Sequence, residues 1–314
     1  MLNRRLIRIK VFKVLYSCIS SGSNSFAEAE KNMHYSCEKT LHLYYFMLNA
    51  AVALKQAADA KIETGMRKFN PTEEERNPNL KFSENKVSEY LLGNPIFKKY
   101  CEENVLSWNG DLALFVKKLF ASISEKDYFK EYMERESRSM AEDCDLFIRI
   151  FEEEFEDNEA LESFLEDMSI YWIDDLGYVL NTIIRNLELL RKSSKMPMPG
   201  IFMKEDDKEY AFNLLRFSLA NYSKYMDIIR ENIANWDPER VVTTDLGLIE
   251  EGIAEAVGFP NIPVKVTINE YVEISKYYST HNSKIFVNGL LDRIIQKMIK
   301  SGEIVKSGRG LIEN

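Results

Sequence analysis

Hydrophobic residues recur at three- and four-residue steps along most of the chain, which is the spacing of helices that bury one face. The broadest stripe lies near the C-terminus and consists of Phe286, Val287, Leu290, Leu291, Ile294, Ile295 and Met298. Before it, Pro263 and a capping-box pattern at Thr267 to Glu270 predict a helix that begins near Thr267 and ends near Tyr278. The second helix contains Gly289, which costs about 1 kcal/mol relative to alanine, so a close backbone approach is expected there. This region is therefore predicted to be a helical hairpin.

The same spacing extends through the rest of the chain and predicts an all-α fold. A first helix is expected over residues 4–19, with a buried stripe at Ile7, Val11, Val14, Leu15 and Cys18. A longer helix is expected over 26–61, and a charged segment with two prolines at 70–78 is predicted to be an exposed loop or linker. Helical spacing continues over 84–195, and two further helices are expected over 210–233 and 245–257. A corner is expected at 235–241, where Trp236 packs inward and Asp237-Pro238 caps the next helix.

Length and charge limit the possible functions. The 314 residues suffice for one large domain or two, and the net charge of −9 makes a protein that coats nucleic acid unlikely. The acidity is concentrated between Glu125 and Asp175, where 19 acidic and 5 basic residues give a local charge of −14. The carboxylates there alternate with a helical apolar stripe, which is typical of an amphipathic helix with a solvated acidic face. Any polyanion must therefore bind a local basic patch elsewhere.

Cysteine usage and hydropathy predict a cytoplasmic protein that does not enter the membrane. Cys18, Cys37, Cys101 and Cys144 are widely spaced and form no C-x-x-C pair, which argues against a zinc site and favours a reducing compartment. The basic residues between 4 and 13 interrupt any signal-peptide core. The most apolar run, 41–54, is shorter than the roughly 20 residues that a membrane span needs.

The sequence does not indicate an enzyme or a bound cofactor. The histidines, His34, His42 and His281, are far apart, and the chain has no H-E-x-x-H, G-x-S-x-G, P-loop or G-x-G-x-x-G motif. The paired acids Asp174 and Asp175 have no neighbouring histidine, and adjacent residues point to different faces of a helix. His281 is compatible with an RNA contact or with an ordinary exposed loop. Binding, rather than catalysis, is therefore the expected activity.

The first predicted helix begins with a cluster of cations. Arg4 and Arg8 lie one turn apart and Arg5 lies three residues from Arg8, while Lys10 follows on the same helix. Cations at a helix N-terminus oppose the macrodipole by about 0.3 to 1 kcal/mol each, so this arrangement suggests a ligand that supplies negative charge, such as RNA phosphate. A solvated basic turn, a membrane-surface helix and an import helix remain alternatives.

The C-terminal hairpin resembles the NusB family of bacterial transcription antitermination factors. The family signature reads approximately IPxKVAINEAIELAKxF followed by SxKFVNGVLD. The corresponding residues here are the run Ile262 to Glu270, then Glu273, Lys276, Tyr277, Ser283, the run Phe286 to Gly289, Leu291 and Asp292. One position departs from the pattern, because Ile285 stands directly before the phenylalanine where the family tends to place lysine. At the N-terminus, Arg4-Arg5-x-x-Arg8 followed by Leu15-Tyr16 is also similar to the family.

This resemblance implies a NusB-like helical bundle that is interrupted by a large helical insertion. The expected organisation is N-terminal NusB-like helices with a basic RNA-binding start over 1–61, an acidic helical insertion over 62–204, a C-terminal NusB-like bundle over 205–300, and a flexible tail over 301–314. The implied function is binding of boxA-type single-stranded RNA together with the ribosomal protein NusE, acting on RNA polymerase in an antitermination complex during rRNA transcription. The alternative is a non-enzymatic interaction scaffold of NusB-like fold that does not bind RNA.

Candidate binding residues follow from the residue types and from the resemblance. The expected RNA-binding residues are Arg4, Arg5, Arg8, Lys10, Asn282, Ser283, Lys284 and Phe286. The cations would hold phosphate, and the start of the last helix offers free amides to phosphate and an aromatic ring to a base. Phe286 also fits the apolar stripe, so a core position is equally compatible with its spacing. The resemblance places Tyr16 and Glu255 in the partner-binding surface, although each also fits an ordinary position at the boundary of the core.

Overall fold

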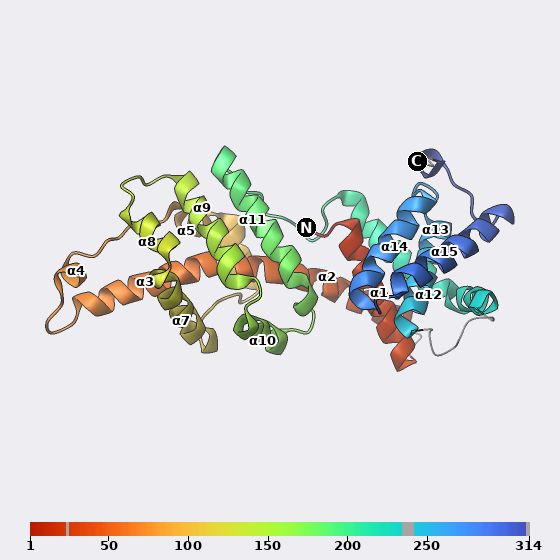
Figure 1. Cartoon of the computed structure of the whole chain (residues 1–314), viewed down its shortest axis with the longest axis horizontal. Coiled ribbons are helices and arrows are strands. Elements are labelled where there is room, and N and C mark those ends of the chain that lie inside the picture. The colour runs from red at the N-terminus through yellow and green to blue at the C-terminus, as the bar shows by residue number, and fades with distance from the viewer. Residues whose placement is uncertain (23–24, 234–241, 312–314) are drawn as a thin grey trace. The chain divides into compact units, whose positions relative to one another are not determined.

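The computed structural model describes residues 1–22, 25–233 and 242–311. In these ranges helices make up the fold, and β-type pairing is limited to an isolated parallel bridge between Leu2 and Phe202 (Figure 1). The prediction of an all-α fold is therefore confirmed. None of the helices in the described ranges is long and apolar enough to cross a membrane.

The chain divides into two compact units. The first unit combines residues 1–37 with residues 201–314, and the second contains residues 38–200. The division falls inside helix α2 (Phe26–Leu48) and after Gly200, whereas the sequence analysis placed the ends of the insertion at 62 and 204. The helical spacing continues without interruption through residue 38, so periodicity alone gives no signal for a division there. The two units are described separately below.

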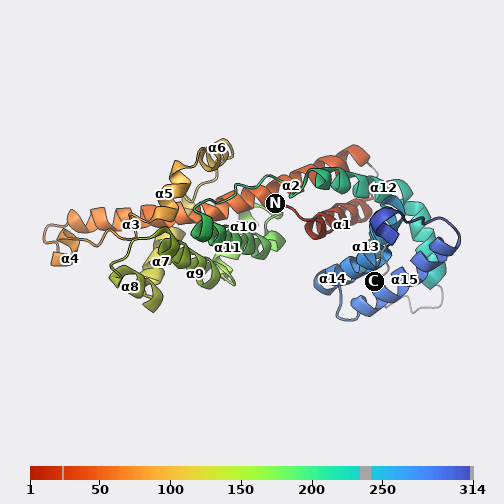
Figure 2. The ribbon, with the colours of Figure 1, turned by 90° about the horizontal axis from the view of Figure 1, so that it is seen from above.

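The first unit is built from helices that come from both parts of the sequence. They are α1 (Arg4–Ser21), the start of α2, α12 (Glu205–Ile233), α13 (Thr243–Gly258), α14 (Val264–Tyr278) and α15 (Ser283–Lys300). Helix α13 is central, because it contacts α1, α12, α14 and α15 (Figure 2). The core is mainly aliphatic and includes the predicted stripe of the last helix from Phe286 to Met298. Local signals delimit α1, since Asn3 accepts a hydrogen bond from the Leu6 amide and Gly22 ends the helix at a φ of 66°.

The second unit is also helical, and aromatic rings fill much of its core. Its helices are the end of α2, α3 (Ala50–Met66), α4 (Glu73–Arg76), α5 (Lys86–Gly93), α6 (Pro95–Glu103), α7 (Asp111–Glu125), α8 (Asp127–Glu134), α9 (Met140–Ile150), η1 (Phe151–Phe155), α10 (Glu159–Met168), η2 (Ile173–Asp175) and α11 (Leu176–Ser193). Trp108 and Trp172 both stack on Phe46, with ring centroids 4.5 and 5.3 Å apart. The unit therefore has its own buried core.

The predicted long helix over 26–61 differs from the observed helices. Two consecutive helices, α2 and α3, occupy this stretch and extend to Met66, with Asn49 between them. The Asn49 side chain donates a hydrogen bond to the carbonyl of Leu106, 2.9 Å away. This contact comes from a residue 57 positions later, so helical periodicity does not reveal it.

Two predictions about the C-terminal hairpin are wrong. Helix α14 begins at Val264, directly after Pro263, and not near Thr267. Thr267 is fully buried, and its hydroxyl donates to Glu255 at 2.7 Å instead of capping the helix. The close approach expected at Gly289 is also absent, because a Cβ built there would meet no heavy atom within 4 Å. The predicted helix end at Tyr278 and the following helix are confirmed.

The segment after α15 is packed where the structure describes it, in contrast to the expected flexible tail. Ile304 is buried in the core of the first unit, and the Lys306 ammonium donates to the carbonyls of Ala256 and Phe259 at 2.8 and 3.1 Å. These two bonds satisfy carbonyls at the C-terminus of α13. The predicted corner at 235–241, with Trp236, lies outside the described residues.

Candidate nucleic-acid interface

Half-buried Arg4 and exposed Arg5 of α1 are paired with carboxylates of the first unit. The Arg4 guanidinium lies 2.8 Å from Asp206 and 3.2 Å from Asp207, at the start of α12. Arg5 donates two hydrogen bonds to the Glu270 carboxylate of α14, at 2.9 and 2.8 Å. The hydrogen bonds that Arg5 donates to Glu270 raise the pKa of Arg5. Burial acts to raise the pKa of Glu270, but the bond from Arg5 and the charge of Arg8 outweigh it and lower that pKa. The negative charge that this helix start needs is thus supplied within the protein.

Arg8 occupies a different environment, because it is buried. Its guanidinium donates to both oxygens of Glu255, at 2.6 and 3.1 Å, and the two side chains are 4% and 0% exposed. Glu255 also accepts hydrogen bonds from the hydroxyls of Tyr210 and Thr267. Burial acts to lower the pKa of Arg8, but the Glu255 charge outweighs it and raises that pKa. We call these four residues the Glu255 hub; they join α1, α12, α13 and α14.

Lys10 is also placed inside the first unit. The residue is buried, and its ammonium lies 3.3 Å from the Ser36 hydroxyl of α2. Of the four cations of α1 proposed for RNA from the sequence, Arg4 and Arg5 therefore reach the surface, whereas Arg8 and Lys10 lie beneath it. In this conformation, only the first two present donors to a ligand in solvent.

Helices α1 and α14 lie alongside each other and bring the arginines near the polar turn. Arg5 and Arg8 contact Glu270, and further along both helices Phe12 packs against Tyr278 with ring centroids 6.0 Å apart. The Lys13 ammonium lies 5.3 Å from the centre of the same tyrosine ring. The two helices therefore run in the same direction, and the turn after Tyr278 continues the edge on which Arg5 lies. We call this surface the α1–α14 edge.

The turn between α14 and α15 is fixed by hydroxyl contacts. Ser283 is buried, and its hydroxyl lies 2.8 Å from both Asp245 and the Thr280 hydroxyl. Asn282 is exposed and Lys284 is half-buried, so both reach solvent beside the start of α15. Phe286 is 9% exposed and belongs to the hydrophobic core, which is the structural position that its spacing also allowed. The turn thus offers an amide and an ammonium group to solvent, while its serine and phenylalanine face inward.

The two residues expected at the partner surface differ in exposure. Tyr16 is 38% exposed in the second half of α1, and its ring centroid lies 6.2 Å from that of Phe12. Glu255 has no exposed surface and is occupied by the hub. In this conformation Tyr16 is accessible to a partner, whereas Glu255 is buried and bound to Arg8, Tyr210 and Thr267.

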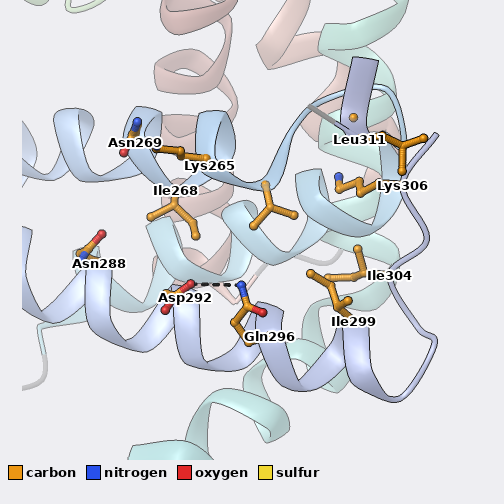
Figure 3. A pocket seen from close by; sticks show the side chains of 12 residues that line it. Lys265, Ile268, Asn269, Asn288, Asp292, Gln296, Ile299, Ile304, Lys306 and Leu311 are labelled. Atoms are coloured by element: carbon orange, nitrogen blue, oxygen red, sulfur yellow. Dashed lines mark hydrogen bonds between the residues drawn. The ribbon is translucent and has the colours of Figure 1, made fainter. Parts of the chain in front are cut away.

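A cavity of about 770 Å³ lies between α14, α15 and the segment that follows α15 (Figure 3). Its lining comes from α14, α15 and the segment after α15, and includes Lys265, Asn269, Asn288, Asp292, Gln296 and Lys306. The Gln296 amide lies 3.5 Å from the Asp292 carboxylate in the same lining. Burial lowers the pKa of Lys306, whose ammonium is directed to the carbonyls at the end of α13. Because of those bonds, Lys306 anchors the C-terminal segment beside the hairpin.

Sequence reasoning missed the acidic partners of the arginines. Asp206 and Asp207 are more than 200 positions from Arg4, and Glu270 was interpreted as half of a capping box. The acidic first turn of α12 is a local signal for a partner of Arg4. It is ambiguous, because acidic residues at a helix start also stabilise the helix dipole. In addition, Tyr277 in the last turn of α14 is 82% exposed, and its sequence position beside Tyr278 gives no signal of which of the two rings reaches solvent.

Comparison with known proteins gives a family for the C-terminal part of the chain. Residues 188–296 match the family model described as the NusB family. Proteins named transcription antitermination protein NusB are 35% identical over 105 residues in Salinibacter ruber, 36% over 106 in Chloroherpeton thalassium and 41% over 90 in Syntrophotalea carbinolica. The matched residues form 33, 34 and 29% of this chain and 66, 50 and 58% of those relatives, so the chain spans about half to two thirds of their length. No solved structure matches the chain.

Proposed function

Because the chain belongs to the NusB family through its residues 188–296, we propose that it is a transcription antitermination factor that acts by binding. The ligand is single-stranded RNA of the boxA type, bound together with the ribosomal protein NusE on RNA polymerase. One observation supports this proposal: α1, which lies outside the matched residues, packs on α12 and α13 and holds Arg5 against Glu270 of α14, the helix that leads into the polar turn. The activity requires no catalytic residue and no cofactor.

In the proposed complex, phosphate groups bind Arg4 and Arg5. Each guanidinium already adopts a geometry that holds carboxylate oxygens, and phosphate oxygens fit the same donors. RNA must therefore compete with Asp206, Asp207 and Glu270 for these donors. Arg8 and Lys10 contribute indirectly, because Arg8 fixes α1 to the Glu255 hub and Lys10 contacts α2. In this proposal Arg4 and Arg5 bind the phosphates, and the contacts of Arg8 with Glu255 and of Lys10 with Ser36 hold α1 in place beneath them.

The polar turn supplies the second half of the proposed site. Asn282 offers amide donors and acceptors to unpaired bases, and Lys284 adds a charge near the start of α15, where backbone amides favour anions. Ser283 and Phe286 hold the turn in place from beneath, through Asp245 and the core respectively. The RNA path we propose runs along the α1–α14 edge from Arg5 to this turn.

The proposed NusE surface includes Tyr16. This tyrosine is partly exposed and packs on Phe12, which itself contacts Tyr278 of the edge. Tyrosine is enriched among interface residues that dominate affinity, because its ring buries a large area and its hydroxyl can pair. Glu255 supports this surface by fixing α1 and does not contact the partner directly.

The test is a salt-dependent titration of boxA-type RNA with wild type and an Arg4→Ala, Arg5→Ala double variant. Losing two phosphate contacts should weaken binding and reduce the slope of log affinity against log salt by about 1.4. Arg230→Ala is the matched control, because this arginine is exposed on α12 and pairs only with Asp227 in the described contacts. If the double variant keeps the wild-type affinity and slope, the start of α1 is not part of the site. Arg8 is left intact because it is buried.

A second candidate function is a scaffold of NusB-like fold that binds a basic protein and no RNA. The charge of the second unit favours it, since residues 38–200 contain 31 acidic and 21 basic residues. This alternative predicts that wild type shows no salt-sensitive RNA binding and yet forms a stable complex with a basic protein. The same titration separates the two functions.

A further inference from the structure

Tyr277 presents its ring to solvent on the α1–α14 edge. It lies in the last turn of α14 and is 82% exposed, more than any other described aromatic residue of the first unit. Its neighbour Tyr278 packs inward against Phe12 and Lys13, which directs the two adjacent rings to different sides of the helix. A single exposed aromatic residue needs no functional explanation by itself. Tyr277 is of interest because it lies on the same helix as Glu270, the partner of Arg5.

Helical geometry places Tyr277 in line with the arginine contacts. It follows Glu270 by seven residues, which is close to two full turns, so both side chains leave α14 on the same face about 10 Å apart along the axis. Glu270 holds Arg5 and lies 3.4 Å from Arg8. On the turn between them, Glu273 pairs with Lys276 and contributes to the charge around Arg5. The exposed ring thus lies between the basic start of α1 and the turn that carries Asn282.

Single-stranded RNA is bound by cations that follow the backbone and by aromatic faces on which unpaired bases stack. The α1–α14 edge has the cations, but the phenylalanine at the start of α15 is packed in the core and cannot offer its face. Tyr277 offers an exposed aromatic face on this edge. Its backbone is already fixed in a helix, so stacking of a base has to order only the side chain.

We propose that Tyr277 is a base-stacking residue, which supports one unpaired base of a single-stranded RNA whose phosphates bind Arg4 and Arg5. This inference rests on the proposed RNA-binding function and adds a specific contact to it. Stacking accepts any base, so Tyr277 contributes affinity and fixes the position of the strand rather than reading its sequence.

The experiment measures binding of a short single-stranded RNA of boxA type that carries a fluorescent purine analogue at successive positions. In wild type, one position is quenched by stacking, and Tyr277→Ala abolishes that quenching and weakens affinity by roughly 5- to 100-fold. The salt slope stays at the wild-type value, because no phosphate contact is lost. Tyr277→Trp retains the quenching, since the indole offers a larger face. Tyr35→Ala, which truncates an exposed tyrosine on α2, is the control and leaves binding unchanged.

The outcomes separate this inference from the function on which it rests. If wild type shows no salt-dependent RNA binding, the proposed function is wrong. If wild type binds RNA and Tyr277→Ala binds with the same affinity and the same quenching, the function stands and the stacking role is wrong. Loss of NusE binding in Tyr277→Ala with unchanged RNA binding would also overturn it and assign the ring to a protein interface. Because Tyr277 is exposed, these variants are expected to fold.

Discussion

The two compact units use the same kind of amphipathic helix, but they distribute charge differently. The first unit contains 20 basic and 19 acidic residues, for a net charge of +1, whereas the second contains 21 and 31, for a net charge of −10. The buried ion pairs of the two units also differ in the sequence separation of their partners. Arg8 and Glu255 in the first unit are 247 positions apart, while Lys81 and Glu142 in the second are 61 apart. The first unit thus depends on charges that join two distant parts of the sequence.

This difference in charge favours the first unit over the second as the site of the proposed RNA binding. A net charge near zero repels phosphate less, and Arg4 and Arg5 lie at the start of a helix fixed by the Glu255 hub, each paired with carboxylates that RNA would have to displace. In the second unit, the excess of carboxylates repels phosphate. Mutations that test the two kinds of buried ion pair should therefore have different consequences for RNA binding.

The largest effect is expected from Glu255→Ala in the first unit. The substitution leaves the Arg8 charge buried without its main partner, and breaking a buried pair in this way costs about 3 to 5 kcal/mol. Denaturant unfolding measures the loss, and RNA affinity should fall with it because α1 loses its anchor. Glu273→Ala is the control, since its pair with Lys276 is exposed and is worth less than about 1 kcal/mol. A cost for Glu255→Ala as small as that of the control would contradict the role of the hub.

A smaller effect is expected from Lys81→Met in the second unit. The Lys81 ammonium donates to the carbonyls of Tyr132 and Arg135 and to the Glu142 carboxylate. Its removal leaves buried acceptors unsatisfied, at a cost of about 1 to 3 kcal/mol, but Glu142 keeps a hydrogen bond from Ser137. Stability should fall, while RNA affinity measured well below the unfolding transition should remain that of wild type. A parallel loss of RNA affinity would show that the two units are not functionally separate.

A pH-dependent effect of intermediate size is expected from Glu251, which is fully buried in the first unit. Burial raises its pKa well above 4.5, and the nearby charges of Glu250 and Glu255 add to this, while Tyr271 and Arg8 oppose it. Above pH 4.5 the unfolded chain releases this proton and the folded protein retains it. Stability is therefore fully present below pH 4.5 and falls by about 1.4 kcal/mol per pH unit as pH rises toward the folded pKa.

Glu251→Gln removes this titration, so the decline in stability between about pH 5 and 7 should become shallower by that slope. Chemical denaturation across this range measures it. The exposed Glu231→Gln on α12 serves as the reference variant and should retain the wild-type profile. An unaltered slope in Glu251→Gln would mean that the carboxyl group does not titrate differently in the folded and unfolded states.

The all-α fold and α1 were predictable from the sequence, because apolar spacing and local caps indicate them, whereas spacing over 84–195 did not give the bounds of the individual helices. The errors came where a distant residue decided the local structure. Thr267 has the pattern of an N-cap, but its hydroxyl binds Glu255, and Pro263 already begins the helix. Likewise, Asn49 lies in an uninterrupted apolar run, and its hydrogen bond to Leu106 is a tertiary contact. A local pattern cannot reveal a partner that only folding brings near.

The positions of the candidate cations on one helix were predictable from the sequence, whereas the burial of each cation was not. The spacing of Arg4, Arg5 and Arg8 correctly placed them in the first turns of one helix, but spacing cannot distinguish the exposed Arg5 from the buried Arg8. The apolar stripe already allowed a core position for Phe286. Tyr277 lay beside Tyr278 in the sequence, and only the packing of α14 against α1 determines which ring is exposed.

The smallest effect is expected on the outer face of the first unit, at Gly289 in α15. A Cβ there meets no heavy atom within 4 Å, so Gly289→Ala should raise the free energy of unfolding by about 1 kcal/mol through its higher helix propensity. Gly252→Ala is the informative contrast, because a Cβ at that position of α13 would lie 2.8 Å from Leu291 and should destabilise by about 1 to 3 kcal/mol. Denaturant unfolding compares the two. If Gly289→Ala destabilised the protein or weakened RNA binding, this face of α15 would have to contact a group that the compact unit itself does not provide.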